Sequence, residues 1–318
     1  MEETILVTGG AGFIGSWTVE RLVSKNYKVV VIDNLESGSI NNIEHLLYKI
    51  TFIRGDIRDK NLLLETCRKY GVVKIIHLAA LVSVEKVSEN PVRGVETNIV
   101  GTLNVLETAR LLDIDRIVYA SSAAVYGEPI KIPIDENHPL NPKNVYGATK
   151  LGGEALVNSY RENYGLKTIS LRYFNVYGPR MQYSDYAGVI IKFIINALSG
   201  KPLTIYGTGE QTRDFIYVED VAKANIRALE SKTTGVFNIG TGVETSINTL
   251  AKKIIELTNS KSKIIHTKPR PGDIMRSVAN IERAKKILGW SPRTQLTQGL
   301  LKTIKYYKAT TTNELKNL

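Results

Sequence analysis

The sequence predicts an α/β fold in which a doubly wound parallel sheet is joined by a second, smaller domain. Two features support this prediction: short apolar runs alternate with segments of helical periodicity, and a glycine-rich turn joins the first run to the first helical segment. The chain of 318 residues is long enough for one large α/β unit and a smaller appended one. We expect a sheet of about seven strands with helices on both faces, and one cleft shared by the two domains.

The sheet domain is expected to take residues 1–174, and the substrate-binding domain mainly residues 175–318. Two later segments, at about 213–244 and 281–295, are expected to return to the sheet domain. The strands predicted to rejoin the sheet within the first return are Phe215–Val218 and Val236–Ile239.

The composition is that of an ordinary globular protein. Cys67 is the single cysteine, and the four histidines show no metal-ligand spacing, so we expect neither an intramolecular disulfide nor a metal. No apolar run approaches the roughly 20 residues of a membrane-spanning helix, and Met1–Thr4 has no basic flank of the signal-peptide kind. These observations predict a cytoplasmic protein that does not bind a membrane.

The formal net charge of +11 suits nucleic-acid binding, but the lysines are dispersed and reach their highest density between Lys252 and Lys316. We interpret the excess as a solvated basic face, part of which helps to attract a phosphate-bearing substrate. No nucleic-acid partner is expected.

The first apolar run, Thr4–Thr8, meets the glycine-rich segment Gly9–Gly15, after which apolar residues recur at helical spacing. This pattern predicts a strand, a tight turn and a helix. The helix N-terminus carries free N–H groups and partial positive charge, so a pyrophosphate can bind there if no side chain blocks its approach. Gly9, Gly12 and Gly15 remove that obstacle.

A second strand, Lys28–Ile32, ends at Asp33, 18 residues after Gly15. A strand, glycine turn, helix, strand and acid in this order are typical of a dinucleotide-binding unit. The Asp33 carboxylate is predicted to accept hydrogen bonds from the adenosine ribose and to repel the 2′-phosphate of NADP. The sequence therefore predicts NAD as the cofactor.

Two further strands, Ile50–Arg54 and Lys74–Leu78, end in segments that are expected to face the cofactor, because ligands of a doubly wound sheet lie beyond the carboxyl ends of its strands. This rule places Asp56-Ile57 near the adenine. It places Ala79-Ala80-Leu81 near the middle of the dinucleotide.

A fifth strand, Arg116–Ala120, leads to Ser122, and a later helix carries Tyr146 and Lys150. Residues four apart lie on one face of a helix, so the Lys150 ammonium is expected beside the Tyr146 phenol. A unit positive charge about 4 Å away, at an effective dielectric of about 20, lowers a phenol pKa of about 10 by roughly three units. We predict that Tyr146 is the base in hydride transfer and that Ser122 hydrogen-bonds the reacting hydroxyl.

Taken together, these residues resemble the extended short-chain dehydrogenase/reductase family and, within it, the UDP-glucose 4-epimerases. The resemblance covers nearly the whole chain. Downstream of Lys150 it is carried by the segments Leu171–Arg180, Ile205–Gly209, Arg213–Phe215 and Arg270–Asp273.

The resemblance implies a set of cofactor contacts, and it places Tyr146 and Lys150 at the nicotinamide ribose. Val82 departs from the pattern, because many sugar epimerases of this type have a lysine there that reaches the cofactor, and this departure implies a somewhat looser grip. Besides the three glycines, the implied cofactor residues are Phe13, Ile14, Asp33, Asn34, Ser37, Gly38, Asp56, Ile57, Ala79, Ala80, Leu81, Asn98 and Phe174.

The resemblance also implies a site for a UDP-sugar, with Arg213 and Arg270 on the diphosphate and Tyr206 against the base. Guanidinium groups match phosphate geometry, which supports the same assignment independently. At Ser277 a small residue is implied to act as a gate that leaves space for an acetamido group. The implied substrate residues are Ser122, Asn175, Gly188, Val189, Tyr206, Arg213, Arg270, Asp273 and Ser277.

Ala123 and Ala124 occupy places where relatives that dehydrate or decarboxylate nucleotide sugars have additional acid or base residues. Without those groups the site is equipped to remove and return a hydride, but poorly equipped to remove a proton at the neighbouring carbon. The resemblance therefore implies an NAD-dependent 4-epimerase that interconverts UDP-glucose and UDP-galactose, and through the Ser277 gate their N-acetylated forms, by way of a 4-keto intermediate.

Other interpretations stay open on the sequence alone. An epimerase of another nucleotide sugar, such as a UDP-uronic acid or an ADP-heptose, fits the same residues, and so does a net nucleotide-sugar dehydrogenase or reductase. A non-catalytic dinucleotide sensor or RNA-binding protein suits the charge but leaves the catalytic group without a purpose. Apolar residues on more than one face of the helices at about Val92–Leu112 and Tyr146–Tyr164 predict a homodimer through a helix bundle.

Overall fold

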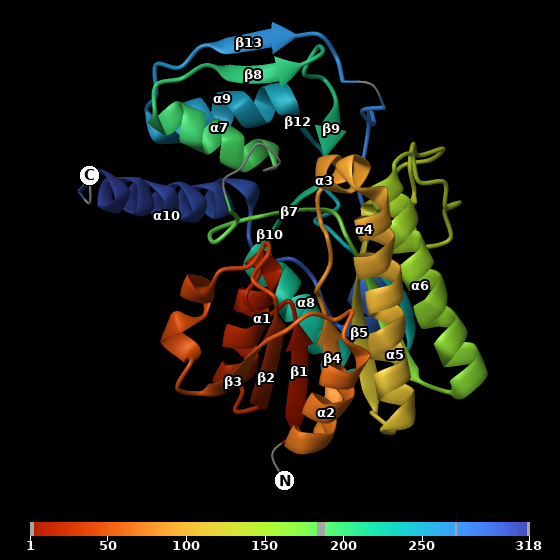
Figure 1. Cartoon of the computed structure of the whole chain (residues 1–318). Helices are drawn as coiled ribbons and strands as arrows, with labels where there is room; N and C mark the ends of the chain where they lie inside the picture. Colours follow the sequence, from red (N-terminus) through yellow and green to blue (C-terminus); the bar gives the residue numbers. More distant parts are fainter. Residues whose placement is uncertain (1–2, 183–187, 271, 317–318) are drawn as a thin grey trace.

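A seven-stranded parallel sheet forms the centre of the protein in a computed structural model that describes residues 3–182, 188–270 and 272–316 (Figure 1). The strand order is β11-β6-β5-β4-β1-β2-β3, so the predicted doubly wound sheet of about seven strands is confirmed. Its strands are β1 (Thr4–Thr8), β2 (Lys28–Asp33), β3 (Ile50–Arg54), β4 (Val72–His77), β5 (Arg116–Ser122), β6 (Lys167–Tyr173) and β11 (Gly235–Ile239).

The order of the strands reverses between β1 and β4. From β1 the chain adds β2 and β3 on one side, and from β4 it adds β5, β6 and β11 on the other. The loops that follow β1 and β4 therefore leave the sheet in opposite directions, which opens a crevice at the carboxyl ends of these two neighbours. The fold places the expected ligand site in this crevice.

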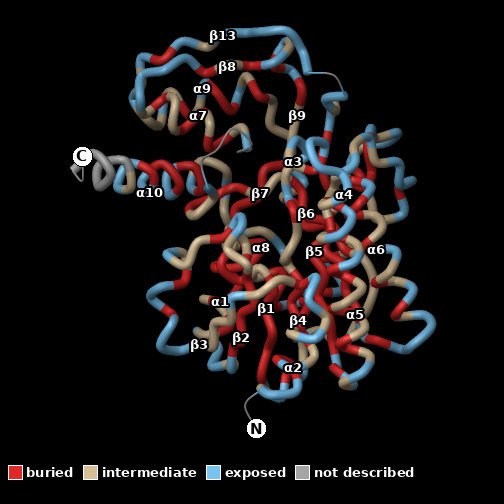
Figure 2. Tube along the Cα trace, viewed as in Figure 1, coloured by how far each residue is buried: buried red, intermediate tan, exposed pale blue. Residues whose placement is uncertain are grey.

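Helices cover both faces of the sheet, because alternate residues of each buried strand are apolar on both sides. In β1, Ile5 and Val7 pack in the core under α1 and α8, whereas Leu6 packs in the core under α2, α5 and α6. Figure 2 shows the central strands buried and the outer faces of these helices exposed. The covering helices are α1 (Phe13–Ser24), α2 (Lys60–Tyr70), α5 (Gly101–Leu111), α6 (Val145–Tyr164) and α8 (Val218–Glu230).

Short helical segments occupy the loops around the sheet. After β4, α3 and α4 lead into a π-helical turn that continues directly into α5. These segments are η1 (Ile40–Asn42), η2 (Glu44–Leu46), α3 (Val84–Glu89), α4 (Pro91–Val95), η3 (Glu96–Val100), η4 (Ala123–Val125) and η5 (Ala284–Leu288).

A smaller group of elements lies above the carboxyl ends of the main sheet and has its own apolar core, to which Phe193, Leu250 and Ile304 belong (Figure 1). Two strand pairs accompany its helices: β8 pairs with β13 in parallel, and β9 pairs with β12 antiparallel. The elements are α7 (Val189–Leu198), β8 (Leu203–Tyr206), β9 (Thr212–Arg213), β12 (Thr245–Ser246), α9 (Ile247–Thr258), β13 (Ile264–Thr267) and α10 (Leu296–Lys316).

One predicted strand does not join the main sheet. The segment Phe215–Val218 was expected there, but β10 (Phe215–Tyr217) pairs in parallel with β7 (Asn175–Tyr177) in a separate two-stranded sheet. The reason is that the edge of β6 is already taken by β11, which is the other predicted return. The apolar side chains of β10 are buried instead beneath the elements packed around it.

None of the helices within the described ranges is long and apolar enough to cross a membrane.

Candidate active site

A cavity of about 620 Å³ lies at the crevice between the loops that follow β1 and β4, and it extends to α7 and to the loop after β13. Most of the predicted site residues line it. These are Gly9, Gly12, Phe13, Ile14, Gly15, Asp33, Asn34, Ser37, Asp56, Ile57, Ala79, Ala80, Leu81, Ser122, Tyr146, Lys150, Phe174, Asn175, Gly188, Val189 and Arg270.

The glycine turn brings α1 against β1 so closely that side chains are excluded. Gly9 adopts a positive φ of 71°, and a Cβ on Gly15 would lie 2.0 Å from the Gly9 carbonyl oxygen. Gly12 is the N-cap of α1 and provides no side-chain cap, so the N–H groups of the first helical turn face the cavity unblocked. This cradle fits the pyrophosphate of a dinucleotide.

Asp33 lies at the end of β2, beside the glycine turn. Its two carboxylate oxygens accept hydrogen bonds from the backbone N–H groups of Ala11 at 2.9 Å and Leu35 at 2.8 Å. Burial raises the pKa of Asp33, and these backbone hydrogen bonds oppose that change. The carboxylate is thereby fixed in the cavity wall, where a ribose can approach it.

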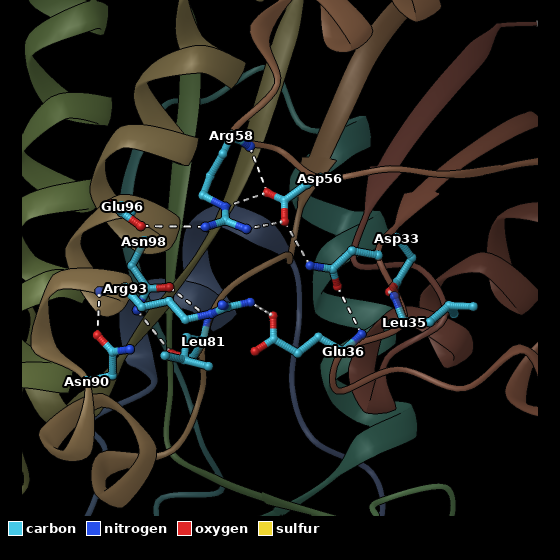
Figure 3. A network of polar contacts seen from close by, with 11 residues as sticks. Asp33, Leu35, Glu36, Asp56, Arg58, Leu81, Asn90, Arg93, Glu96 and Asn98 are labelled. Carbon is cyan, nitrogen blue, oxygen red and sulfur yellow. Dashed lines mark hydrogen bonds and ion pairs between the residues drawn. The ribbon is translucent and has the colours of Figure 1, made fainter.

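Asp56 and Asn34 both line the cavity, and Figure 3 shows the Asp56 carboxylate beside Arg58. Asn34 Nδ2 donates to Asp56 Oδ2 at 2.9 Å, and Arg58 donates to both carboxylate oxygens at 2.9 and 3.0 Å. The Arg58 hydrogen bonds are the main reason that the pKa of Asp56 falls to about 2. Asp56 is therefore ionised at neutral pH.

Asn98, predicted as a cofactor contact, is 1% exposed and lies outside the cavity lining. Its side chain accepts from the Leu81 N–H at 2.7 Å and donates to the Leu81 carbonyl at 3.0 Å and to Thr149 at 2.9 Å. Asn98 thus holds the cavity-lining Leu81 to the helix that carries Tyr146. Gly38, another predicted contact, also lies outside the lining.

The three predicted catalytic residues converge on the cavity from β5 and α6. Asn144 caps α6 by accepting from the Gly147 N–H at 2.8 Å, which starts the helix just before Tyr146. A Cβ on Gly147 would lie 2.7 Å from the Ala124 carbonyl oxygen, so the helix packs tightly against the loop of Ser122. As a result, the side chains of Ser122 and Tyr146 hydrogen-bond each other.

Lys150 has a different partner from the one predicted. Its ammonium donates to the Ala120 carbonyl at 2.9 Å, and burial lowers its pKa to about 8. The pKa of Tyr146 is raised by burial and is lowered only in part by its hydrogen bond with Ser122. The predicted lowering of the Tyr146 pKa by Lys150 is therefore not found in this side-chain arrangement, in which desolvation outweighs the interaction with Ser122.

A buried ion pair behind the predicted catalytic residues was missed by the sequence analysis. Glu154, one turn beyond Lys150 on α6, accepts from Arg172 Nε at 3.0 Å and from Ser121 Oγ at 2.6 Å. The Arg172 and Glu154 side chains are only 4% and 1% exposed. The signal for this pair was an acid on the apolar face of a predicted helix, but its partner is on a separate strand and only the tertiary structure reveals it.

The predicted substrate residues of the smaller region are divided between the cavity and its surroundings. Arg270 lines the cavity; its guanidinium lies 4.1 Å from the centre of the Tyr206 ring, and it pairs with Glu85 of α3 at 3.5 Å. Arg213 and Asp273 form an ion pair with each other outside the lining.

Tyr206 and Ser277 also lie outside the cavity lining, and Ser277 is buried at 8% exposure. Pro271, in the motif that carries Arg270, lies outside the described residues.

A doubly wound sheet with a glycine cradle, a strand-end carboxylate and a serine, tyrosine and lysine at one cavity defines a dinucleotide-dependent oxidoreductase-type site. Residues 6–303 match the family model described as GDP-mannose 4,6 dehydratase. The chain belongs to this family, the extended short-chain dehydrogenases/reductases, and is an enzyme of its epimerase and dehydratase group.

Individual relatives agree with this assignment. A Methanocaldococcus jannaschii protein provisionally named a UDP-glucose 4-epimerase is 46% identical over 96% of this chain and 98% of its own. The crystal structure of a Thermotoga maritima UDP-glucose 4-epimerase with UDP-glucose superposes with a TM-score of 0.94 at 37% identity, covering 97% of this chain and 99% of that one. A Thermus thermophilus UDP-glucose 4-epimerase in complex with NAD has a TM-score of 0.90 at 37% identity, over 96% and 99% of the two chains.

Relatives with other chemistry are also present. A UDP-glucuronic acid decarboxylase of Xenopus tropicalis is 35% identical over 98% of this chain and 74% of its own length. Overall similarity therefore identifies the family but does not distinguish between these reactions.

Proposed function

We propose that this protein is an NAD-dependent nucleotide-sugar 4-epimerase that interconverts UDP-glucose and UDP-galactose. The observation that carries the proposal is the convergence of Ser122, Tyr146 and Lys150 on one cavity while the neighbouring positions hold Ala123 and Ala124. Several relatives of this chain are named UDP-glucose 4-epimerases, which supports the same reaction.

The glycine cradle, Asp33 and the other cavity-lining residues would hold NAD, which would supply the hydride acceptor and donor for the sugar C4. The protein's own residues handle the proton and the orientation. The Tyr146 phenol oxygen takes the proton of the 4-hydroxyl, and Ser122 Oγ, hydrogen-bonded to Tyr146, positions the reacting oxygen. Because burial raises the Tyr146 pKa, the phenol depends on positive charge from Lys150 and from the cofactor to act as a base.

The nucleotide must hold the substrate in place while the 4-keto sugar rotates in the cavity, since the sugar has to present both of its faces to the cofactor. We assign Arg270, which lines the cavity, to the diphosphate. Because epimerisation has no net oxidation or reduction, the protein has no need to release its cofactor between turnovers.

A decarboxylase or dehydratase is the second candidate, because relatives with those activities match nearly the whole chain. Both reactions require a proton to be removed or delivered at a carbon beside C4. Ala123 and Ala124 offer no acid or base for that step, which favours the epimerase.

We also propose a homodimer through the helices Val92–Leu112 and Tyr146–Tyr164.

The deciding experiment is to incubate the protein with UDP-, dTDP- and ADP-sugars and to resolve the products by NMR. We expect UDP-glucose and UDP-galactose to equilibrate with no net oxidation and no loss of carbon dioxide or water. A uronic acid or heptose as the sole substrate, or a pentose product, would contradict the proposal.

Acceptance of N-acetylated sugars is a further part of the proposal. A UDP-N-acetylglucosamine 4-epimerase from Methanobrevibacter ruminantium matches at a TM-score of 0.93 and 37% identity, over 98% of this chain and all of that one. Ser277→Tyr is expected to suppress turnover of UDP-N-acetylglucosamine and to spare UDP-glucose. Because Ser277 is buried, the melting temperature of the variant has to be measured as well. Equal loss of both activities in a folded variant would remove Ser277 from the gate.

A further inference from the structure

An ion pair joins the two sides of the cavity at its adenosine end (Figure 3). Glu36 belongs to the loop after β2 and lines the cavity, three residues beyond Asp33. Arg93 belongs to α4, in the connection that follows β4. Arg93 Nη2 donates to Glu36 Oε2 at 2.6 Å.

The position of this pair follows from the strand order. β2 and β4 flank β1 on opposite sides, so the loops that follow them form the two sides of the crevice above the glycine turn. Glu36 and Arg93 are 57 residues apart in sequence, and their side chains meet across that crevice. The pair therefore connects two loops that follow strands on opposite sides of β1.

A second chain of contacts links the same two walls nearby. It runs from Asn34 through Asp56 to Arg58, and Arg58 lies 3.5 Å from Glu96 of η3 (Figure 3). This chain includes Asp56, which is predicted to lie near the adenine, and Asn34, which is predicted to contact the cofactor. Glu36 touches this chain through its backbone, whose N–H donates to Asn34 Oδ1 at 3.0 Å, whereas the ion pair with Arg93 uses the Glu36 side chain. A change of the Glu36 side chain therefore removes the ion pair without removing the backbone hydrogen bond to Asn34.

Arg93 also has a contact with the N-cap residue of its own helix, and part of its side chain is buried. Its backbone N–H donates to the Asn90 side chain at 3.1 Å, and its Nε is buried without a hydrogen-bond partner. The Nε of the guanidinium is thus covered by the protein, while Nη2 extends to Glu36 on the other side.

We propose that the Glu36–Arg93 pair is a clasp over the adenosine end of the cavity that retains bound NAD. This inference rests on the proposed function for the identity of the cofactor, and it adds two residues that act on cofactor release rather than on the reaction. To leave, the adenosine moves out between the loop after β2 and α4, so the ion pair breaks before the dinucleotide is free. Removing the pair speeds release and leaves the chemical step unchanged.

The test uses the full-length protein loaded with NADH, mixed with excess lactate dehydrogenase and pyruvate so that every released NADH is oxidised. The rate at which NADH fluorescence disappears then gives the release rate. The variants are Glu36→Gln, Arg93→Gln and the double variant. Lys167→Gln serves as the control, because Lys167 forms a comparably exposed pair with Asp115 at the amino end of β6, away from the cavity.

Each single variant is expected to release NADH about two- to fivefold faster, the range for a partly exposed ion pair. The double variant should be no faster than either single one, because the two side chains act as one unit. High salt should accelerate the wild type and not the double variant. The control should release at the wild-type rate.

Unchanged release in the single variants, or additive effects in the double variant, would overturn the clasp while leaving the proposed function intact. A wild-type protein that binds no dinucleotide would overturn both. Both side chains are about 40% exposed, so the variants are expected to fold, and unchanged melting temperatures check this.

Discussion

The two sides of the active-site cavity hold their polar groups in different ways. On the sheet side, Asp33 and Lys150 are buried and fixed by hydrogen bonds to backbone groups, and Tyr146 interacts with Ser122. On the side of the smaller region, Arg270 is 47% exposed and pairs with a half-exposed glutamate, and Arg213 pairs with Asp273.

This difference matches two tasks. Groups that act in the transition state gain from fixed positions and a low local dielectric, where each charge and hydrogen bond has a larger effect. Groups that capture and release a charged nucleotide have to exchange a protein partner for a phosphate, which partial exposure permits at low cost. The comparison predicts that changes on the sheet side affect rate and pKa, whereas changes on the other side affect binding.

The largest effect is expected from Tyr146→Phe. Loss of the phenol should lower kcat about 1000-fold with little change in substrate binding, because the group acts on a proton in the transition state. The measurement is steady-state epimerase kinetics together with nucleotide-sugar binding by calorimetry. Tyr164→Phe, at an exposed position on the same helix, is the control and should be fully active. Near-normal turnover in the Tyr146 variant would mean that another group is the base.

A smaller effect is expected on the free energy of unfolding, and it tests how strongly Lys150 is desolvated. Burial lowers the pKa of Lys150 from 10.5 to about 8. Between these two pH values the unfolded chain binds a proton that the folded chain does not, so the free energy of unfolding rises with pH across this window. Relative to Lys150→Met, the wild type should gain up to about 3 kcal/mol between pH 8 and 10.5.

Urea unfolding of both proteins at the two ends of this window measures the difference. Lys167→Met, which removes an exposed lysine, should follow the wild-type curve. Parallel curves for the wild type and Lys150→Met would show that Lys150 is not desolvated in the folded protein.

The smallest effect is expected on the other side of the cavity. Arg270→Met should raise KM for the UDP-sugar about tenfold and leave kcat within a factor of about two, because a half-exposed charged contact to a phosphate contributes to binding in the ground state and the transition state alike. Arg276→Met is the matched control, since Arg276 is 58% exposed, pairs with Glu244 and lies outside the cavity lining. A fall in kcat with unchanged KM would place Arg270 in the chemical step and remove the contrast between the two sides.

The features that the sequence alone determined are local or periodic. Strand, glycine turn and helix at Thr4–Ser24 follow from residues within one short segment, and Asp33 follows from the strand after it. The spacing of Tyr146 and Lys150 on one helix is likewise a local property. Such features are encoded by neighbours in the chain, so they could be predicted without knowing how distant segments meet.

The tertiary structure decided what depends on distant segments. The segment that begins at Phe215 pairs with β7 because β11 occupies the edge of the main sheet, and no local sequence pattern shows which of the two segments takes that edge. The Tyr146 pKa is raised because the folded chain buries the phenol, and the spacing of Tyr146 and Lys150 along the helix does not show how far the phenol is buried. The Glu36–Arg93 pair arises only when the loops after β2 and β4 face each other, because long-range ion pairs are set by the topology of the sheet.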